Sequence, residues 1–168
     1  MPYSAKAIAN EFLSMPQVRR AGVSPMKLQK LVYFAHAWHL AIKNQPLINE
    51  HVEAWEYGPV IPSVYHEFKR FGNEDITESA KEYDHISNKM FEPSIEDFTN
   101  EDNEETKALL DRIWEIYGPF SAIQLSNMTH TEDSPWYIAY NSPDFRRGMA
   151  IDNNVIADYF KHLLKSGN

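Results

Sequence analysis

The sequence predicts a mainly α-helical fold with a small β element, built as a single compact domain. Most apolar residues recur at intervals of three and four, which is the period of an amphipathic helix. Serine, often followed by proline, stands where several of these stripes begin, as expected for helix N-caps. Only residues 51–57 alternate in the manner of a strand. We therefore expect about six to seven helices, with a short strand or hairpin after the long second helix.

Two helices are predicted in the first quarter of the chain. The first runs from about Ser4 to Met15, with apolar residues on one face, and Pro16 and Gly22 bracket the link that follows. Ser24-Pro25 then starts the second helix, because a hydroxyl cap precedes a proline at the first helical position. Its apolar stripe continues for about five turns, to about Lys43. The apolar face of this long helix is wide, as expected for a buried central element.

The middle of the chain combines a strand, a helix and an irregular acidic stretch. The alternation within residues 51–57 predicts a short strand, and Gly58-Pro59 is expected to turn the chain. A third helix opens at Pro62 and ends at Gly72. Residues 73–102 are polar and weakly periodic, so irregular structure is expected there, with one short strand near residues 89–91.

The last third is again helical. A fourth helix is predicted from about Asn103 to Tyr117, and Ser121 caps a short fifth helix through Met128. Ser134-Pro135 repeats the cap-plus-proline signal for a sixth. The final helix begins at Asp152 or Asn153 and carries the apolar residues Val155, Ile156, Tyr159, Phe160, Leu163 and Leu164.

Composition narrows the class of protein. The 168 residues are 43% hydrophobic and 13% aromatic, enough for a real core, and we treat 1–168 as one domain. The chain has no cysteine, which removes disulfides and thiolate chemistry and favours the cytoplasm. It also has no apolar run of membrane-spanning length and no signal-peptide pattern at its start, so no membrane partner is expected.

The net charge of −8 is unevenly distributed. Residues 1–49 hold six basic side chains and one acidic side chain, whereas residues 90–106 hold seven acidic side chains and no basic one. An acidic chain is a poor nonspecific binder of nucleic acid, because phosphate neutralisation supplies most of that affinity. The long second helix also suits a core better than a DNA groove, so direct DNA binding is not expected. The segment at about 73–105 is either a solvated surface or a region adapted to a partner.

Three histidines are candidates for catalytic or metal-binding residues. His36 and His39 lie three apart on the second helix, but the zinc-protease pattern requires a different spacing and an adjacent glutamate. His130 lies between two helices, and Ser134 lacks the Gly-x-Ser-x-Gly elbow and reads better as a helix cap. We therefore expect no catalytic set, no metal and no cofactor. A hydrolase centred on His130 or on the His36/His39 pair is the alternative.

Aromatic residues near turns are the feature of the composition that favours protein binding. They supply large contact areas with few torsions to freeze, as interface hot spots do, although a domain of this size also buries most of its aromatics. The aromatics in or beside turns are Trp55, Tyr57, Tyr65, Trp136, Tyr137 and Tyr140.

Three blocks of sequence, in order, resemble the Panacea domain of the SocA-like antitoxins, proteins long described only as phage-associated. The first is residues 26–35, Met-Lys-Leu-Gln-Lys-Leu-Val-Tyr-Phe-Ala. The second is residues 52–65, which contain Trp-Glu-Tyr-Gly-Pro-Val-Ile-Pro. The third begins at Tyr117-Gly118 and includes residues 121–126, His130 and Pro135-Trp136. The resemblance covers roughly Tyr3 to Phe160.

The resemblance implies a function. Members of this family act as antitoxins in toxin–antitoxin systems, often on prophages, and neutralise a toxin encoded by the adjacent gene through protein–protein contact. The SocA type also implies an alternative role as an adaptor that delivers its toxin to a ClpXP-type protease. In this chain the second helix and the Trp55–Pro59 turn are expected to form a rigid platform with Lys27 and Lys30 exposed at one end. The candidate partner-binding residues are Lys27, Lys30, Trp55, Tyr57, Tyr65, His130 and Trp136.

Overall fold

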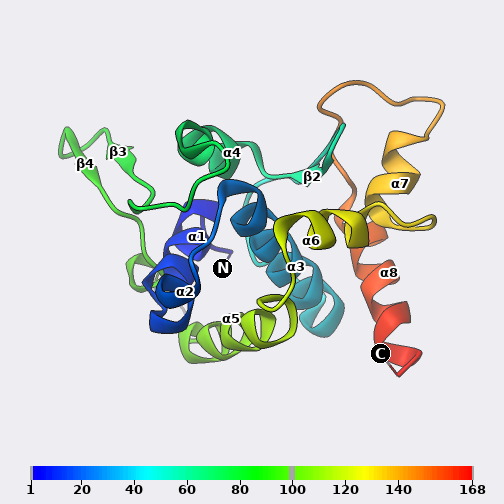
Figure 1. The fold of residues 1–168 in the computed structure, drawn as a ribbon, viewed down its shortest axis with the longest axis horizontal. Helices are drawn as coiled ribbons and strands as arrows, with labels where there is room; N and C mark the ends of the chain where they lie inside the picture. The colour runs from blue at the N-terminus through cyan, green and yellow to red at the C-terminus, as the bar shows by residue number, and fades with distance from the viewer. Residues whose placement is uncertain (1, 99–100, 168) are drawn as a thin grey trace.

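The computed structural model describes residues 2–98 and 101–167 (Figure 1). Within these ranges it contains eight α-helices and two antiparallel two-stranded hairpins, so the prediction of a mainly helical fold is confirmed. In order, the elements are α1 Ala5–Ser14, α2 Pro16–Ala21, α3 Pro25–Lys43, β1 Glu53–Trp55, β2 Gly58–Val60, α4 Pro62–Phe68, the 3-10 turn η1 Lys69–Phe71, β3 Glu82–Asp84, β4 Lys89–Phe91, the 3-10 turn η2 Ile95–Asp97, α5 Asn103–Tyr117, α6 Ala122–Thr129, α7 Pro135–Tyr140 and α8 Asn153–Lys165.

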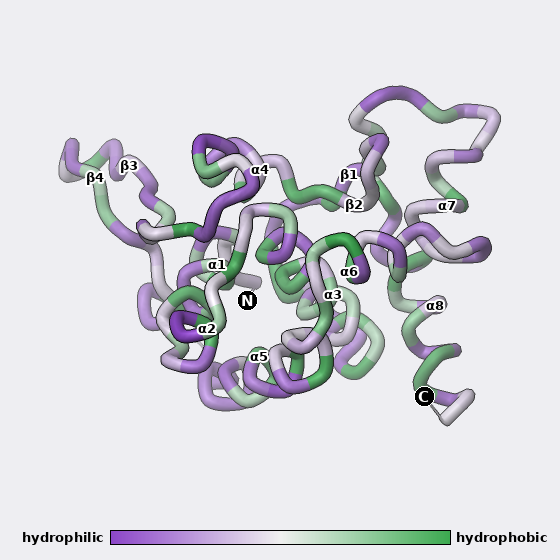
Figure 2. Tube along the Cα trace, viewed as in Figure 1, coloured by the Kyte–Doolittle hydropathy of each residue, from purple (hydrophilic) through white to green (hydrophobic). Residues whose placement is uncertain are grey.

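Helix α3 is the centre of the fold. It contacts α1, α4, α5, α6, α8 and strand β2, which surround it in Figure 1. The Ser24 hydroxyl accepts a hydrogen bond from the Lys27 amide, and Pro25 occupies the first turn, as the sequence predicts. Asn44 ends the helix in the left-handed conformation with φ of 56°. Neighbours cover α3 closely enough to bury Gln29, Lys30 and His36 as well as its apolar residues, and both green and purple residues occur along it in Figure 2.

Aromatic packing joins α3 to the C-terminal helices. The ring of Phe160 on α8 lies 5.1 Å from Trp38, in an edge-to-face arrangement. Phe34 stacks on Tyr117 of α5 at 4.0 Å between centroids, and the Trp38 indole donates a hydrogen bond to the Tyr117 hydroxyl at 2.8 Å. Such aromatic contacts add to the free energy gained by burying the rings. They hold α5 and α8 against the same stretch of α3, residues 34–38.

A buried amide attaches the irregular segment to α1. Asn10 donates to the carbonyls of Ala80 and Pro93, at 3.0 and 2.8 Å, and accepts from the Ala80 amide at 2.7 Å. Ala80 and Ile95 are fully buried. Between them the chain extends away from the body as the β3–β4 hairpin (Figure 1). One polar side chain thereby satisfies backbone groups on both sides of the hairpin.

Three details differ from the sequence-based prediction. The link after α1 forms a short helix, α2, because Pro16 occupies a first-turn position rather than breaking the chain. The turn of the first hairpin lies at residues 56–57, and Gly58 and Pro59 belong to β2, paired with β1 in the register Trp55↔Gly58. The strand expected at residues 89–91 exists, but it pairs with β3, which the pattern did not indicate.

Among the described residues, no helix is both long and apolar enough to cross a membrane.

His36 is a buried histidine at the centre of the fold. Its Nδ1 accepts from the Leu47 amide at 3.3 Å, and its Nε2 lies 3.1 Å from the Asn153 side-chain oxygen, to which it donates as the neutral ring. The side chain is fully buried, and burial lowers the pKa of His36 to about 4. The imidazole therefore joins α3, the residue 47–48 segment and α8 without carrying a charge.

This pKa makes stability depend on pH. Since the pKa of His36 is lower in the folded chain than in the unfolded one, the unfolded chain binds more protons and stability falls as pH drops below about 6.5. Between pH 7 and pH 5 the His36 contribution to the loss of unfolding free energy is about 2 kcal/mol. Denaturant titrations should show that the decline over this range is smaller by that amount in His36→Gln than in the wild type. Exposed His85→Gln, on the β3–β4 hairpin, should retain the wild-type decline; an unchanged pH profile in His36→Gln would contradict the assignment.

Candidate protein-binding groove

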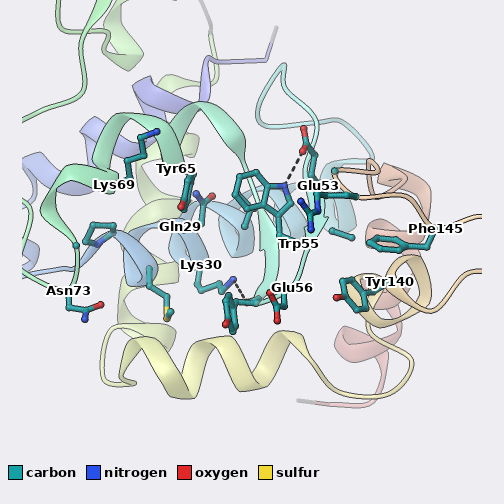
Figure 3. Close-up of a pocket in the computed structure, with 18 residues that line it drawn as sticks. Gln29, Lys30, Glu53, Trp55, Glu56, Tyr65, Lys69, Asn73, Tyr140 and Phe145 are labelled. Carbon is teal, nitrogen blue, oxygen red and sulfur yellow. Dashed lines mark hydrogen bonds between the residues drawn. The ribbon is translucent and has the colours of Figure 1, made fainter.

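A surface groove with a volume of about 730 Å³ runs along the first hairpin (Figure 3). Figure 3 shows Lys69 and Asn73 toward one end, Trp55 and Tyr65 in the middle, and Tyr140 and Phe145 at the other end. Four predicted partner-binding residues line it: Lys30, Trp55, Tyr57 and Tyr65. Met26, Gln29, Glu53, Glu56, Arg147 and Gly148 are among its other lining residues.

Gln29 holds the far end of the hairpin to α3. Its side-chain oxygen accepts from the Ile61 amide at 2.8 Å, and its nitrogen donates to the Ile61 carbonyl at 3.2 Å. The amide thereby satisfies both polar groups of one buried residue, in the manner of a strand pair. Gln29 and Ile61 are both buried.

Lys30 holds the turn of the same hairpin. Its Nζ donates to the carbonyl oxygens of Tyr57 and Pro59, at 3.3 and 3.2 Å. The side chain is only 2% exposed, so the expectation of an exposed Lys30 is wrong. Burial lowers the pKa of Lys30 to about 8. The ammonium lies at the inner side of the groove, which it helps to line.

Gly58 permits this close packing. Its φ of +117° is a conformation that other residues rarely adopt. A Cβ at this position would lie 2.8 Å from Lys30 Nζ, 3.0 Å from Thr129 Oγ1 and 3.2 Å from His130 Cε1. Gly58 is therefore required by the close contact of β2 with Lys30 and with residues 129–130, whereas the sequence pattern predicts a turn at Gly58-Pro59.

Exposed and half-buried aromatic side chains form the walls. Trp55 packs edge-on against Tyr65 at 4.8 Å between centroids, and its indole donates to Glu53 Oε1 at 3.0 Å. Tyr57 is 70% exposed and Tyr65 is 41% exposed. At the other end, Tyr140 lies 4.6 Å from Phe145. The groove thus combines rings that are accessible to a partner with a backbone that α3 holds in place.

His130 and Trp136 lie behind the hairpin and support it. The Trp136 indole donates to the Trp55 carbonyl at 2.6 Å, and Trp136 is only 7% exposed. The His130 ring lies 4.2 Å from that of Trp136, and its Nδ1 donates to the Ser126 carbonyl at 2.5 Å. Both side chains are thus engaged within the fold, and their contact with a partner stays a prediction.

Lys27 lies outside the groove. Its Nζ donates to the Gly118 carbonyl at 2.7 Å and lies 5.2 Å from the centroid of the Trp114 ring. The side chain is half-buried, and desolvation lowers the pKa of Lys27. Lys27 and Lys30 therefore project to different parts of the molecule, the first to the end of α5 and the second to the hairpin.

Sequence reasoning did not place Lys69, Phe145 and Arg147 at this surface. All three line the groove, although they come from η1 and from the loop before α8. The loop reaches the hairpin because the Ala54 amide donates to the Met149 carbonyl at 2.9 Å and the Ile151 amide donates to the Val52 carbonyl at 2.7 Å. The Arg146-Arg147 pair can be seen in the sequence, but its position near the groove follows only from these two backbone hydrogen bonds.

Comparisons with known proteins match the chain to one family. Residues 28–137 match the model of the "Antitoxin SocA-like, Panacea domain" family. The chain is also 33% identical to the protein "Antitoxin SocA" of Caulobacter vibrioides (strain NA1000 / CB15N), over 94% of this chain and 82% of that protein. No solved structure matches the chain. The matched range includes α3 from Leu28 onward, the first hairpin, α6 and the start of α7, which together build most of the groove and its support.

The packing around Gly58 predicts a specific loss of stability. Gly58→Ala combines an unfavourable φ with a Cβ that overlaps Lys30, so we expect unfolding free energy to fall by about 3 kcal/mol. Gly72→Ala is the matched control, because Gly72 also has positive φ, +60°, but a Cβ there would meet nothing within 4 Å. It should lose only the cost of the strained backbone, about 1 to 2 kcal/mol, in the same denaturant titration. Equal losses in the two variants would show that contact with Lys30 is unimportant.

Proposed function

Since the chain belongs to the SocA-like antitoxin family that carries the Panacea domain, we propose that it neutralises a protein toxin by binding it along the first hairpin. The toxin is the product of an adjacent gene, as the family resemblance implies. The observation that carries the proposal is the groove, in which accessible tyrosines stand on and beside a hairpin that α3 holds in place.

Rigidity and exposure together favour protein binding. Tyr57, Tyr65 and Met26 are each more than 40% exposed although they lie on or beside well-packed elements. Tyrosines of this kind contribute strongly to binding because burial of a large ring freezes few torsions. A platform that is already ordered also lowers the entropy cost of association. The surface is therefore suited to a stable complex with another protein.

The hydrolase alternative is less well supported. His36 is enclosed by the core, and its two ring nitrogens meet the Leu47 amide and Asn153. His39 Nδ1 donates to the Gln45 carbonyl at 2.6 Å, and His130 Nδ1 donates to the Ser126 carbonyl. A general base needs a free nitrogen within reach of substrate and a partner that orients the ring. Of these three residues, His36 has no free nitrogen, and the rings of His39 and His130 are oriented by backbone carbonyls rather than by a carboxylate.

Co-expression tests the proposal directly. When the adjacent gene is induced alone, growth should stop, and the present chain should restore it and co-purify with the product. A growth arrest that the chain does not relieve, with no co-purification, would exclude that product as its toxin.

Two variants test the position of the interface. Tyr57→Ala and Tyr65→Ala should each weaken toxin binding about tenfold or more, because they remove exposed rings at the centre of the groove. Tyr83→Ala is the matched control: Tyr83 is 43% exposed but lies on β3, away from the groove. Binding is measured by calorimetry with purified toxin. Loss of binding in Tyr83→Ala alone would instead place the interface on the acidic segment at 73–105.

Delivery of the toxin to a ClpXP-type protease is a second candidate function. The observation that favours it is the β3–β4 hairpin, which extends from the side of the molecule opposite α7 (Figure 1). Ile86 at its turn is 97% exposed, so an apolar surface stays available while the groove is occupied.

The half-life of the toxin separates the two functions. Delivery predicts that the toxin is degraded several-fold faster when chain and protease are both present, and that Ile86→Ser slows this without affecting growth rescue through the groove. Pulse-chase measurement of an unchanged half-life would leave sequestration alone.

A further inference from the structure

Lys30 is a buried cation without a carboxylate partner. Among residues 2–98 and 101–167, no Asp or Glu oxygen lies within 4.0 Å of its Nζ. Its hydrogen bonds go to the carbonyls of Tyr57 and Pro59, while an ammonium has three donors. Buried lysines are uncommon unless they are paired, because desolvation of the charge is costly.

Holding the hairpin does not require this charge. One residue earlier, Gln29 holds Ile61 with an uncharged amide at 2.8 and 3.2 Å. A neutral side chain with donors would serve the two carbonyls above Lys30 equally well, without the cost of burying an ammonium. The charge therefore points to a ligand that approaches from the groove.

Two further cations line the same groove. Lys69 and Arg147 are exposed, and in the described residues neither has a carboxylate within 4.0 Å. The groove also has two acids. Glu53 accepts from the Trp55 indole, and Glu56 is exposed at the hairpin turn. The groove is thus net positive on a chain of charge −8, which makes it a local attraction for anions.

We propose that the groove receives an extended acidic segment of the toxin, with one Asp or Glu carboxylate placed against Lys30 and its apolar neighbours on the aromatic walls. This rests on the proposed toxin binding and specifies the chemistry of the partner. A carboxylate supplies the missing acceptor and forms a charge-assisted hydrogen bond in a partly dehydrated site. The rings of Trp55 and Tyr65 on one side and Tyr140 on the other suit apolar side chains along an extended chain.

Charge reversal on the two exposed cations tests the proposal without disturbing the hairpin. Lys69→Glu/Arg147→Glu should weaken the binding of purified toxin about tenfold or more, and the loss should shrink at high salt. Arg20→Glu/Lys165→Glu is the matched control, because it changes the net charge equally at exposed positions outside the groove. It should change affinity less than about twofold. Equal effects in the two double variants, or tighter binding by the groove variant, would overturn the proposal.

Peptides test the carboxylate at Lys30 independently of the toxin. The probe is an acetylated and amidated octapeptide with one central aspartate between leucines, compared with its asparagine twin. Binding is followed by the NMR shift of the Trp55 indole N–H at millimolar peptide. The aspartate peptide should bind at least about fivefold more tightly, and Lys30→Met, if its spectrum is that of a folded protein, should abolish the preference. Equal binding of both peptides to the wild type would overturn the proposal.

A third peptide distinguishes a side-chain carboxylate from a terminal one, because it has neutral side chains and a free C-terminus. Stronger binding of this peptide than of the aspartate peptide would assign the groove to a chain terminus and overturn the side-chain proposal.

Failure of the proposed toxin binding and failure of the acidic-segment proposal give different results. If the wild type does not bind the toxin but prefers the aspartate peptide, the toxin assignment is wrong and the site stands. If the wild type binds the toxin, but Lys69→Glu/Arg147→Glu binds it equally well and the aspartate and asparagine peptides bind alike, only the acidic-segment proposal fails.

Discussion

Two consecutive side chains of α3, Gln29 and Lys30, bind the β1–β2 hairpin to the core through the carbonyl or amide groups of Tyr57, Pro59 and Ile61. A hairpin of three residues per strand is not stable by itself in water. It persists here because α3 satisfies its inner polar groups, Met149 and Ile151 pair with its outer edge, and the Trp136 indole binds its turn. The groove exists only while these attachments hold.

The same attachments explain why the family is recognisable from three short blocks. Residues 26–35 supply α3, residues 52–65 supply the hairpin and the start of α4, and the third block supplies α6 and the start of α7. These segments are distant in sequence and meet around Gly58, where a Cβ would overlap Lys30 Nζ and lie tightly against Thr129 and His130. Much of the family signature therefore encodes a scaffold, and the exposed rings of Tyr57 and Tyr65 are among the parts of it that are accessible to a partner.

Long periodic stripes could be predicted closely, as α3 and α5 show, because burial of one helix face is a local property, and the Ser24 cap also marked the start of α3. The β3 strand could not, since its three residues are stabilised by pairing with β4 rather than by their own pattern. The aromatic candidates Trp55, Tyr57 and Tyr65 do lie together at one groove. Lys69, Phe145 and Arg147 were missed because they reach it from separate segments.

The sequence by itself determined the helical class, the extent of the long helices and the family, because periodicity, caps and motifs depend on residues that are close together in the chain. The tertiary structure decided which lysine is buried and which histidine lies in the core. Lys27 and Lys30 are three residues apart on one helix, yet one reaches the Gly118 carbonyl at the end of α5 and the other lies under the hairpin. Burial and charge pairing depend on what packs against a residue, and such contacts join segments that the chain order keeps apart.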